Sequence, residues 1–291
     1  MIAALRAARL GWHGIDRRIA AHASRGGGFT VFAHELFWFG AKQAWACLFG
    51  ALMLALLIAT CLFWPADAPL GRYDFVTLMA IAIQIVLLAS GLETRREALV
   101  IVLFHVTGTL MELFKTATGS WIYPGPSILH IGGVPLFTGF MYASVGSYIA
   151  RAWRLFEFRF TRHPRWSHTA LLAAAIYLNF FADHYKLDVR WLLFVVVAWM
   201  FGPCRVHYRV RRRYRRMPLL LGFMLVALFI WFAENLGTFT RVWMYPAQHR
   251  AWHMVPPEKI GSWLLLMIIS YVMVSALYRR ALPDAAAGQR G

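Results

Sequence analysis

MELFKTATGSWIYP, residues 111–124, recurs at residues 233–246 as AENLGTFTRVWMYP. Two windows of this length are expected to agree at about one position by chance, so the recurrence indicates a structural unit that is present twice. We therefore predict a tandem internal repeat, with copies near residues 98–153 and 219–278. The six identical positions are Glu112/Glu234, Thr116/Thr238, Thr118/Thr240, Trp121/Trp243, Tyr123/Tyr245 and Pro124/Pro246.

The composition is that of a polytopic membrane protein. Of the 291 residues, 60% are hydrophobic and only 15% are charged, and the apolar runs approach the ~20 residues that a helix needs to cross a bilayer. A soluble domain with such segments would expose large apolar patches. We therefore predict an all-α fold, an integral membrane helical bundle with about eight transmembrane helices. The predicted spans are 44–63, 75–92, 98–114, 133–153, 168–181, 191–204, 219–236 and 260–278.

The basic residues are distributed as membrane topology predicts. A net charge of +17 alone would suit a nucleic-acid partner. However, 22 of the 30 Lys and Arg residues fall on one set of alternate loops and seven on the other, and such an excess marks the cytoplasmic side. We therefore expect no nucleic-acid partner, and we expect both termini in the cytoplasm.

The chain divides into one membrane domain and two flanks. Residues 1–33 are basic and place apolar side chains on one helical face, as in a helix that lies on a membrane surface. Residues 34–280 are predicted to form the transmembrane domain, and residues 281–291 a cytoplasmic tail. Because an even number of spans separates the two copies, they have the same orientation, with both recurring loops at the outer face.

Two glutamates within apolar helices are the first candidates for chemistry. An ionisable side chain at the bilayer centre costs about 2.5 to 3.5 kcal/mol on insertion scales, so it marks a functional candidate. Glu112 and Glu234 lie near the ends of their predicted helices, where burial and the helix dipole both disfavour the anion. Either carboxyl is therefore a candidate general acid or base. The structural alternative is a glutamate that accepts hydrogen bonds from the Thr, Trp and Tyr that follow it.

Other polar and aromatic residues are predicted at the same membrane level. His105 precedes Glu112 by one heptad on the same helical face, so it is a third catalytic candidate. An aromatic belt at the membrane interface explains the Trp and Tyr residue types, but not their repeated spacing. We therefore expect the paired loops to form one pocket or one packing seam. The candidate substrate-binding residues are Trp121, Tyr123, Trp243, Tyr245, Thr116, Thr238, Asn179 and Asp183.

The motifs of cofactor-dependent and metal-dependent enzymes are missing. His249 and His253 have the spacing that places two imidazoles on one helix face, but no carboxylate partner is fixed by spacing. The sequence contains no HExxH, GxSxG, GxxxxGK[ST] or GxGxxG motif, which removes the usual support for hydrolase and nucleotide-driven activities. We therefore predict no metal and no cofactor.

A long stretch resembles a known family. GSWIYPGPSILHIGGVPLFTGFMYASVGSYIARAW at residues 119–153, and KIGSWLLLMIISYV at residues 259–272, resemble the bacterial membrane family called domain of unknown function 817, the YoaT-like proteins. The resemblance extends over residues 34–280 and implies a protein of the bacterial inner membrane. It implies no activity.

A weaker similarity concerns the residues around Glu112. An acidic residue that ends a membrane helix, followed by an aromatic loop and by Gly133-Val134-Pro135 at the next helix, is similar to membrane carotenoid hydratases and lycopene cyclases. In those enzymes carboxylic acids protonate an isoprenoid within the bilayer. The similarity implies that Glu112 is such an acid.

Three functions remain open at this point. The first is a cofactor-independent intramembrane cyclase, hydratase or isomerase that acts on an isoprenoid or other lipid through Glu112 and Glu234. The second is a proton- or cation-coupled transporter of a small molecule, in which the copies are moving halves. The third is a non-catalytic scaffold. The expected partners are membrane lipids and a hydrophobic small molecule.

Overall fold

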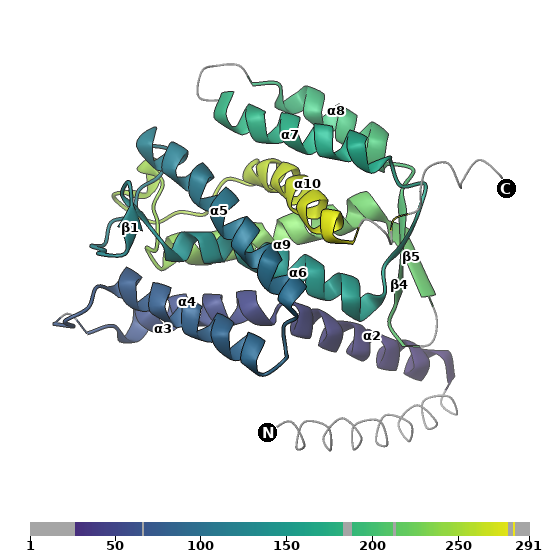
Figure 1. Ribbon diagram of the computed structural model, residues 1–291, viewed down its shortest axis with the longest axis horizontal. Helices are drawn as coiled ribbons and strands as arrows, with labels where there is room; N and C mark the ends of the chain where they lie inside the picture. The colour runs from purple at the N-terminus through teal and green to yellow at the C-terminus, as the bar shows by residue number, and fades with distance from the viewer. Residues whose placement is uncertain (1–26, 66, 183–187, 212–213, 279–281, 283–291) are drawn as a thin grey trace.

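The computed structural model describes residues 27–65, 67–182, 188–211, 214–278 and 282, which form a mostly helical bundle (Figure 1). The predicted amphipathic segment before residue 27 lies outside the described residues, as does most of the predicted tail. The helices are α2 (Gly27–Ala46), α3 (Leu48–Phe63), α4 (Arg72–Ala89), α5 (Arg95–Ala117), α6 (Phe137–Phe156), α7 (Trp166–Ala182), α8 (Arg190–Phe201), α9 (Leu219–Phe239) and α10 (Lys259–Leu277).

The prediction of an all-α membrane bundle is confirmed. Each of the eight predicted spans overlaps one helix from α3 to α10. Within the described residues, α4, α5, α9 and α10 are long and apolar enough to cross a membrane, and the bent pair α2 and α3 would be a fifth span. The protein is therefore a multi-pass membrane protein, and the count of eight spans stays a prediction.

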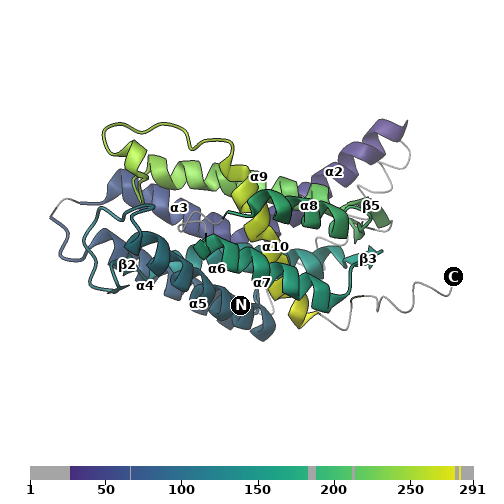
Figure 2. The ribbon, with the colours of Figure 1, turned by 90° about the horizontal axis from the view of Figure 1, so that it is seen from above.

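Short strands close the two ends of the bundle, and the sequence analysis predicted none of them. A hairpin of β1 (His130–Ile131) and β2 (Val134–Pro135) lies at one end. An antiparallel sheet of β3 (Arg159–Thr161), β4 (Arg205–Arg209) and β5 (Tyr214–Pro218) lies at the other. Figures 1 and 2 both place the hairpin and the sheet at opposite ends. The predicted helix opening at residues 133–135 is instead a turn residue followed by strand β2, and α6 begins at Phe137.

The first predicted span is part of a broken helix. α2 and α3 meet at Cys47 with a bend of 67°, and Figure 2 shows α2 leaving the direction of α3. Arg151, which is 0% exposed, donates to the carbonyl oxygen of Trp45 at 3.1 Å and binds Glu93 at 2.7 Å. A buried charge requires such partners. The ion pair joins α6 to the turn between α4 and α5, and the bond to Trp45 joins α6 to the end of α2 beside the break.

Local hydrogen bonds set both ends of α5. At its start, Thr94 and Glu97 form a capping box in which each side chain bonds the other residue's backbone N–H. At its end, the N–H groups of Gly119 and Ser120 bond back into the last turn, with Gly119 at φ +69°. This is a Schellman motif, which favours glycine at the left-handed position. The end of α9 has the same pattern, with Arg241 at φ +52° in place of the glycine.

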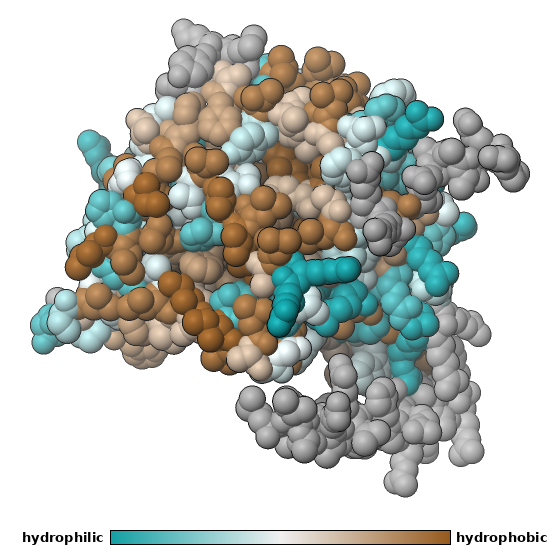
Figure 3. All heavy atoms as spheres, viewed as in Figure 1, coloured by the Kyte–Doolittle hydropathy of each residue, from teal (hydrophilic) through white to brown (hydrophobic). Residues whose placement is uncertain are grey.

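α5 packs closely on α6 and presents its other face outward. A Cβ atom at Gly108 would lie 2.6 Å from the Tyr142 ring, and one at Gly146 would lie 2.7 Å from Phe104. Small residues let two membrane helices approach in this way. The outer face of α5 is apolar and exposed, as in a helix surrounded by lipid, and Figure 3 shows broad hydrophobic areas over the middle of the molecule. Its exposed residues are Leu99, Val102, Leu103, Val106 and Leu110.

Candidate functional site

Glu112 is held by three hydrogen-bond donors. Its Oε2 accepts from the indole of Trp121 at 2.7 Å and from the hydroxyl of Tyr123 at 2.6 Å. Its Oε1 accepts from Tyr142 of α6 at 2.8 Å. The side chain is buried, so these bonds replace the water that a carboxyl would otherwise bind. They also fasten the loop after α5 to the helix that precedes it.

Glu234 has a similar arrangement, with two donors in place of three. Its Oε1 accepts from Tyr245, which is the counterpart of Tyr123, and its Oε2 accepts from the indole of Trp263 at 2.7 Å. Trp263 belongs to α10. The counterpart of Trp121 is Trp243, whose ring instead packs against Gly237, where a Cβ atom would lie 2.0 Å from the ring.

The two recurring loops are bonded to each other. Ile122 and Met244 form an antiparallel bridge in which each backbone N–H donates to the other residue's carbonyl oxygen at 3.0 Å. These two residues occupy equivalent positions in the matching stretches. The expectation that the paired loops form one seam therefore agrees with this contact.

Three consecutive residues at the start of α4 form hydrogen bonds to the same loops. The Arg72 guanidinium donates to the Thr240 carbonyl at 3.1 Å, and the Tyr73 hydroxyl donates to the Val242 carbonyl at 2.8 Å. The Asp74 carboxylate accepts from the hydroxyl of Ser127 and from two backbone N–H groups of the loop before β1. The site is thus fixed by α4 as well as by the two glutamates.

The loop tyrosines remain protonated donors. Burial, and then the charge of Glu112, raise the pKa of the Tyr123 hydroxyl well above its usual value. Burial and the charge of Glu234 do the same to the pKa of Tyr245. Both hydroxyls therefore keep their protons over the physiological range, and each can take part in moving a proton without ionising itself.

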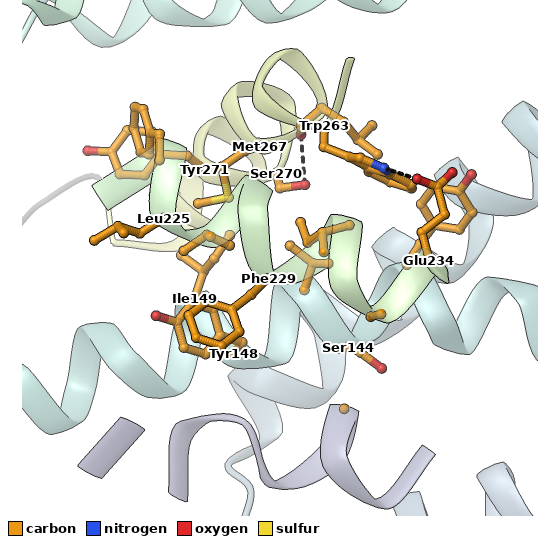
Figure 4. Close-up of a pocket in the computed structure, with 18 of the residues that line it drawn as sticks. Ser144, Tyr148, Ile149, Leu225, Phe229, Glu234, Trp263, Met267, Ser270 and Tyr271 are labelled. Carbon is orange, nitrogen blue, oxygen red and sulfur yellow. Dashed lines mark hydrogen bonds between the residues drawn. The ribbon is translucent and has the colours of Figure 1, made fainter. Parts of the chain in front are cut away.

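Both glutamates line one cavity of about 1160 Å³. Its walls come from α3, α6, α9 and α10, and it extends to α2 near the helix break. Figure 4 shows Glu234 and Trp263 at one end and Tyr271 and Leu225 at the other. Apart from the end at the glutamates, the lining is mainly apolar, so the cavity has one polar end and a long hydrophobic body.

The predicted site residues divide into those that line this cavity and those that do not. Thr238 is buried beside Asn235 and Trp252, to which its hydroxyl is bonded, and Thr116 also lies away from the cavity. Asp183 lies outside the described residues. The predicted residues that line the cavity are Glu112, Glu234, Trp121, Tyr123, Trp243, Tyr245 and Asn179.

His105 lies between α5 and α6 and not in the cavity. Its ring packs on Phe140 with centroids 4.7 Å apart, and a Cβ atom at Gly139 would lie 2.2 Å from its Nδ1. Asn179 lines the cavity but also ends α7, where its side chain accepts from the Val189 N–H and lies 3.4 Å from Asp188. His105 is thus packed between two helices, and Asn179 joins the end of α7 to the segment before α8.

The region of His249 and His253 differs from its predicted form. The two residues are exposed and lie in an irregular loop after the short 3₁₀ helix at Pro246–Gln248. Because this segment is not helical, the spacing does not place both imidazoles on one helix face. Across the described part of the chain, no group of three His, Cys, Asp or Glu side chains could hold a metal ion.

Some members of the site had no signal in the recurring stretches. Tyr142 and Trp263 bind the two glutamates from the following helices, 30 and 29 residues later. They occupy nearly equivalent positions, but they differ in residue type, so identity did not reveal them. The sequence prediction treats Arg72 only as a basic residue of an outer loop. Three polar residues in a row, Arg72, Tyr73 and Asp74, begin an otherwise apolar helix, and this pattern indicates a role in binding the neighbouring loops.

Comparisons with known proteins identify a family. The model of the family described as "Protein of unknown function (DUF817)" matches residues 35–271. The "Uncharacterized protein YoaT" of Bacillus subtilis (strain 168) is 45% identical over 239 residues, which cover 82% of this chain and 90% of that protein.

Two crystal structures of MvINS, an Insig homolog from Mycobacterium vanbaalenii, are also similar to the chain. One has a TM-score of 0.48 and 13% identity, and the other, of a cross-linked trimer, has 0.47 and 12%. Each match covers 66% of this chain and 98% of the solved chain. On the family match and the close relative, this chain belongs to the DUF817 family.

Proposed function

We propose that this protein is an intramembrane enzyme that moves protons on an isoprenoid or a related lipid. The observation that carries the proposal is that Glu112 and Glu234, each bonded to tyrosine, lie on the wall of one mainly apolar cavity. Its volume of about 1160 Å³ lies above the ~300–1,000 Å³ of sites for drug-sized ligands. Such a cavity suits a long-chain molecule.

The partners of each carboxyl identify the oxygen that carries a proton in the acid form. An indole N–H donates and cannot accept, so the Oε2 atoms of Glu112 and Glu234 must be acceptors. The proton of either acid therefore belongs on Oε1. There it faces the hydroxyl of Tyr142 or Tyr245, which can reverse its role and accept.

The two carboxyl groups support a balanced reaction. One carboxylic acid donates its proton to a carbon–carbon double bond of the lipid and leaves a carbocation. The other carboxylate removes a proton from a neighbouring carbon, so the double bond moves and no atom is gained or lost. The aromatic faces at this end of the cavity stabilise the cation. Exchange with solvent at the outer loops then restores both carboxyls.

Glutamine variants test this role with little disturbance of the fold. In Glu112→Gln, the amide oxygen can accept from Trp121 and Tyr123, and the amide N–H can donate to Tyr142. Mass spectra of lipid extracts are compared from cells with equal membrane levels of wild type, Glu112→Gln and Glu234→Gln. We expect a lipid isomer, with unchanged mass and altered chromatographic retention, only in wild type. Extracts that are identical across the three would contradict the enzyme.

The control is Glu157→Gln. Glu157 is exposed at the end of α6 and does not line the cavity. This variant should give the wild-type product, which separates proton transfer from a general loss of negative charge.

A transporter is a second candidate, because the 67° break at Cys47 lies on the cavity wall. Broken helices beside a substrate site are common in transporters. Proton-coupled uptake into vesicles that is lost in Glu234→Gln, together with unchanged lipids, would favour it. A scaffold predicts that the glutamine variants alter neither lipids nor uptake and lower only thermal stability.

A further inference from the structure

We infer that the cavity opens sideways to the bilayer between α3 and α9, and that one chain of a membrane lipid enters there. Several residues that line the cavity are also exposed at the surface of the molecule. On α9, Phe229 is 71% exposed and Leu225 is 45% exposed. A side chain that borders both the cavity and the outside marks the place where the two spaces join.

The opposite edge of this opening is α3. Cys47 and Ala51 line the cavity and are exposed as well. α3 packs mainly on α6 and α4 and makes few contacts with α9. Therefore no close helix pair seals the two edges from each other.

The surroundings of the opening select a hydrophobic occupant. α9 is long and apolar enough to cross a membrane, so the exposed sides of Leu225 and Phe229 face lipid tails and not water. An opening at that depth admits molecules already dissolved in the bilayer. Water-soluble substrates would need an opening at a membrane surface.

The cavity also orients the occupant. Its polar end holds Glu112 and Glu234, whereas Tyr148 and Ile149 of α6 lie on the apolar wall beside Phe229 (Figure 4). A lipid with a reactive double bond near the glutamates would therefore extend its remaining chain toward α2. The position of the reactive double bond near the glutamates rests on the proposed function. Entry of the lipid chain through the opening does not, because entry requires no chemical step.

α9 offers a matched pair of variants for the test. Leu221 and Leu225 lie one turn apart and are 47% and 45% exposed, but only Leu225 lines the cavity. Leu225→Trp should obstruct the opening. Leu221→Trp adds the same indole to the same lipid-facing helix and leaves the opening unchanged.

The experiment uses full-length protein in vesicles of phosphatidylethanolamine and phosphatidylglycerol, with a diazirine analogue of a long-chain prenyl alcohol as the probe. After photolysis, mass spectrometry quantifies labelling of residues 141–156, which supply the α6 wall. Because the indole occupies space in the opening, we expect labelling of this wall to fall on the order of tenfold in Leu225→Trp. Leu221→Trp should label as wild type does.

Equal labelling of the α6 wall in all three proteins, or its absence in wild type, would overturn the inference. The same labelling experiment on Glu112→Gln distinguishes this inference from the proposed function, because the variant lacks the carboxyl but keeps the opening. Wild-type labelling in that variant, with no lipid product from any variant, would support the opening and contradict the enzyme. A lipid product that forms equally in wild type and Leu225→Trp would support the enzyme and contradict the opening.

Discussion

Trp121 and Tyr245 meet edge to face, with their ring centroids 6.0 Å apart. Trp121 donates its indole N–H to Glu112. Tyr245 donates its hydroxyl to Glu234. The aromatic contact therefore joins the hydrogen-bond cluster of Glu112 to that of Glu234. Each glutamate holds one of the two rings, and the two rings pack against each other.

This dependence predicts different outcomes for two substitutions at Glu112. Glu112→Ala leaves three buried donors without their acceptor, and each orphaned polar group costs about 1–3 kcal/mol. Glu112→Gln keeps an acceptor for the indole and one hydroxyl. We therefore expect a clearly lower apparent Tm in detergent for Glu112→Ala and a nearly unchanged one for Glu112→Gln.

Tryptophan fluorescence provides the second measurement on the same samples, because Trp121 loses its partner only in the alanine variant. Equal melting of wild type and Glu112→Ala would show that the carboxyl does not hold the loop.

Arg72 is expected to stabilise the loop after α9 through its shape as well as its charge. Its guanidinium donates to the Thr60 hydroxyl and to the carbonyl oxygens of Leu57 and Thr240. A lysine ammonium cannot reach three acceptors that diverge in this way. Arg72→Lys should therefore lower stability by about 1.5–3 kcal/mol, the range for hydrogen bonds to charged groups.

The measurement for Arg72→Lys is the apparent Tm together with the rate of limited proteolysis in residues 240–258. Arg250→Lys is the control, because Arg250 is exposed in the same loop. A faster cleavage rate in both variants, or in neither, would contradict the role of Arg72.

The helices and part of the site could be predicted because their determinants are local. Apolar runs placed a helix at each predicted span, and the short distance along the chain from Glu112 to Trp121 and Tyr123 suggested their hydrogen bonds. The second copy shows the limit of this reasoning. Glu234 takes its indole from Trp263 in another helix, a choice that depends on how α9 and α10 pack.

The strands, the helix break and the cavity depend on still less local information. β1 and β2 have two residues each, too few for a pattern of alternating hydrophobicity to be recognised. The break at Cys47 contains neither proline nor an adjacent glycine. A contact beside it comes from Arg151 of α6, which lies 106 positions from Trp45.

Gly237 is expected to tolerate no side chain. A Cβ atom there would lie 2.0 Å from the ring of Trp243, which is itself buried. Gly237→Ala should destabilise the protein by about 1–3 kcal/mol, because the ring or the helix must move. Gly40→Ala is the control, since a Cβ atom at Gly40 of α2 meets nothing within 4 Å.

Thermal unfolding of the two glycine variants in the same detergent provides the comparison. Because alanine favours helix over glycine by about 1 kcal/mol, Gly40→Ala should melt at or above the wild-type temperature. A Gly237→Ala protein as stable as wild type would mean that Trp243 is free to move.

His163 is expected to make the stability depend on pH. Its ring is buried, with Nδ1 2.6 Å from the Pro164 carbonyl and Nε2 2.8 Å from the Tyr271 hydroxyl. The neutral ring satisfies both contacts, with Nδ1 donating and Nε2 accepting. Burial lowers the pKa of His163 in the folded protein, so the unfolded chain binds the proton more readily.

Stability should therefore fall as the pH drops through about 6.5, the ordinary pKa of an unfolded histidine, and continue to fall toward the lower folded value. His163→Gln removes this titration, so its Tm should change less over the same interval. His249→Gln, at an exposed histidine in the loop after the 3₁₀ helix, should keep the wild-type dependence. If both variants retained the full slope, the acid sensitivity would have to arise from groups other than His163.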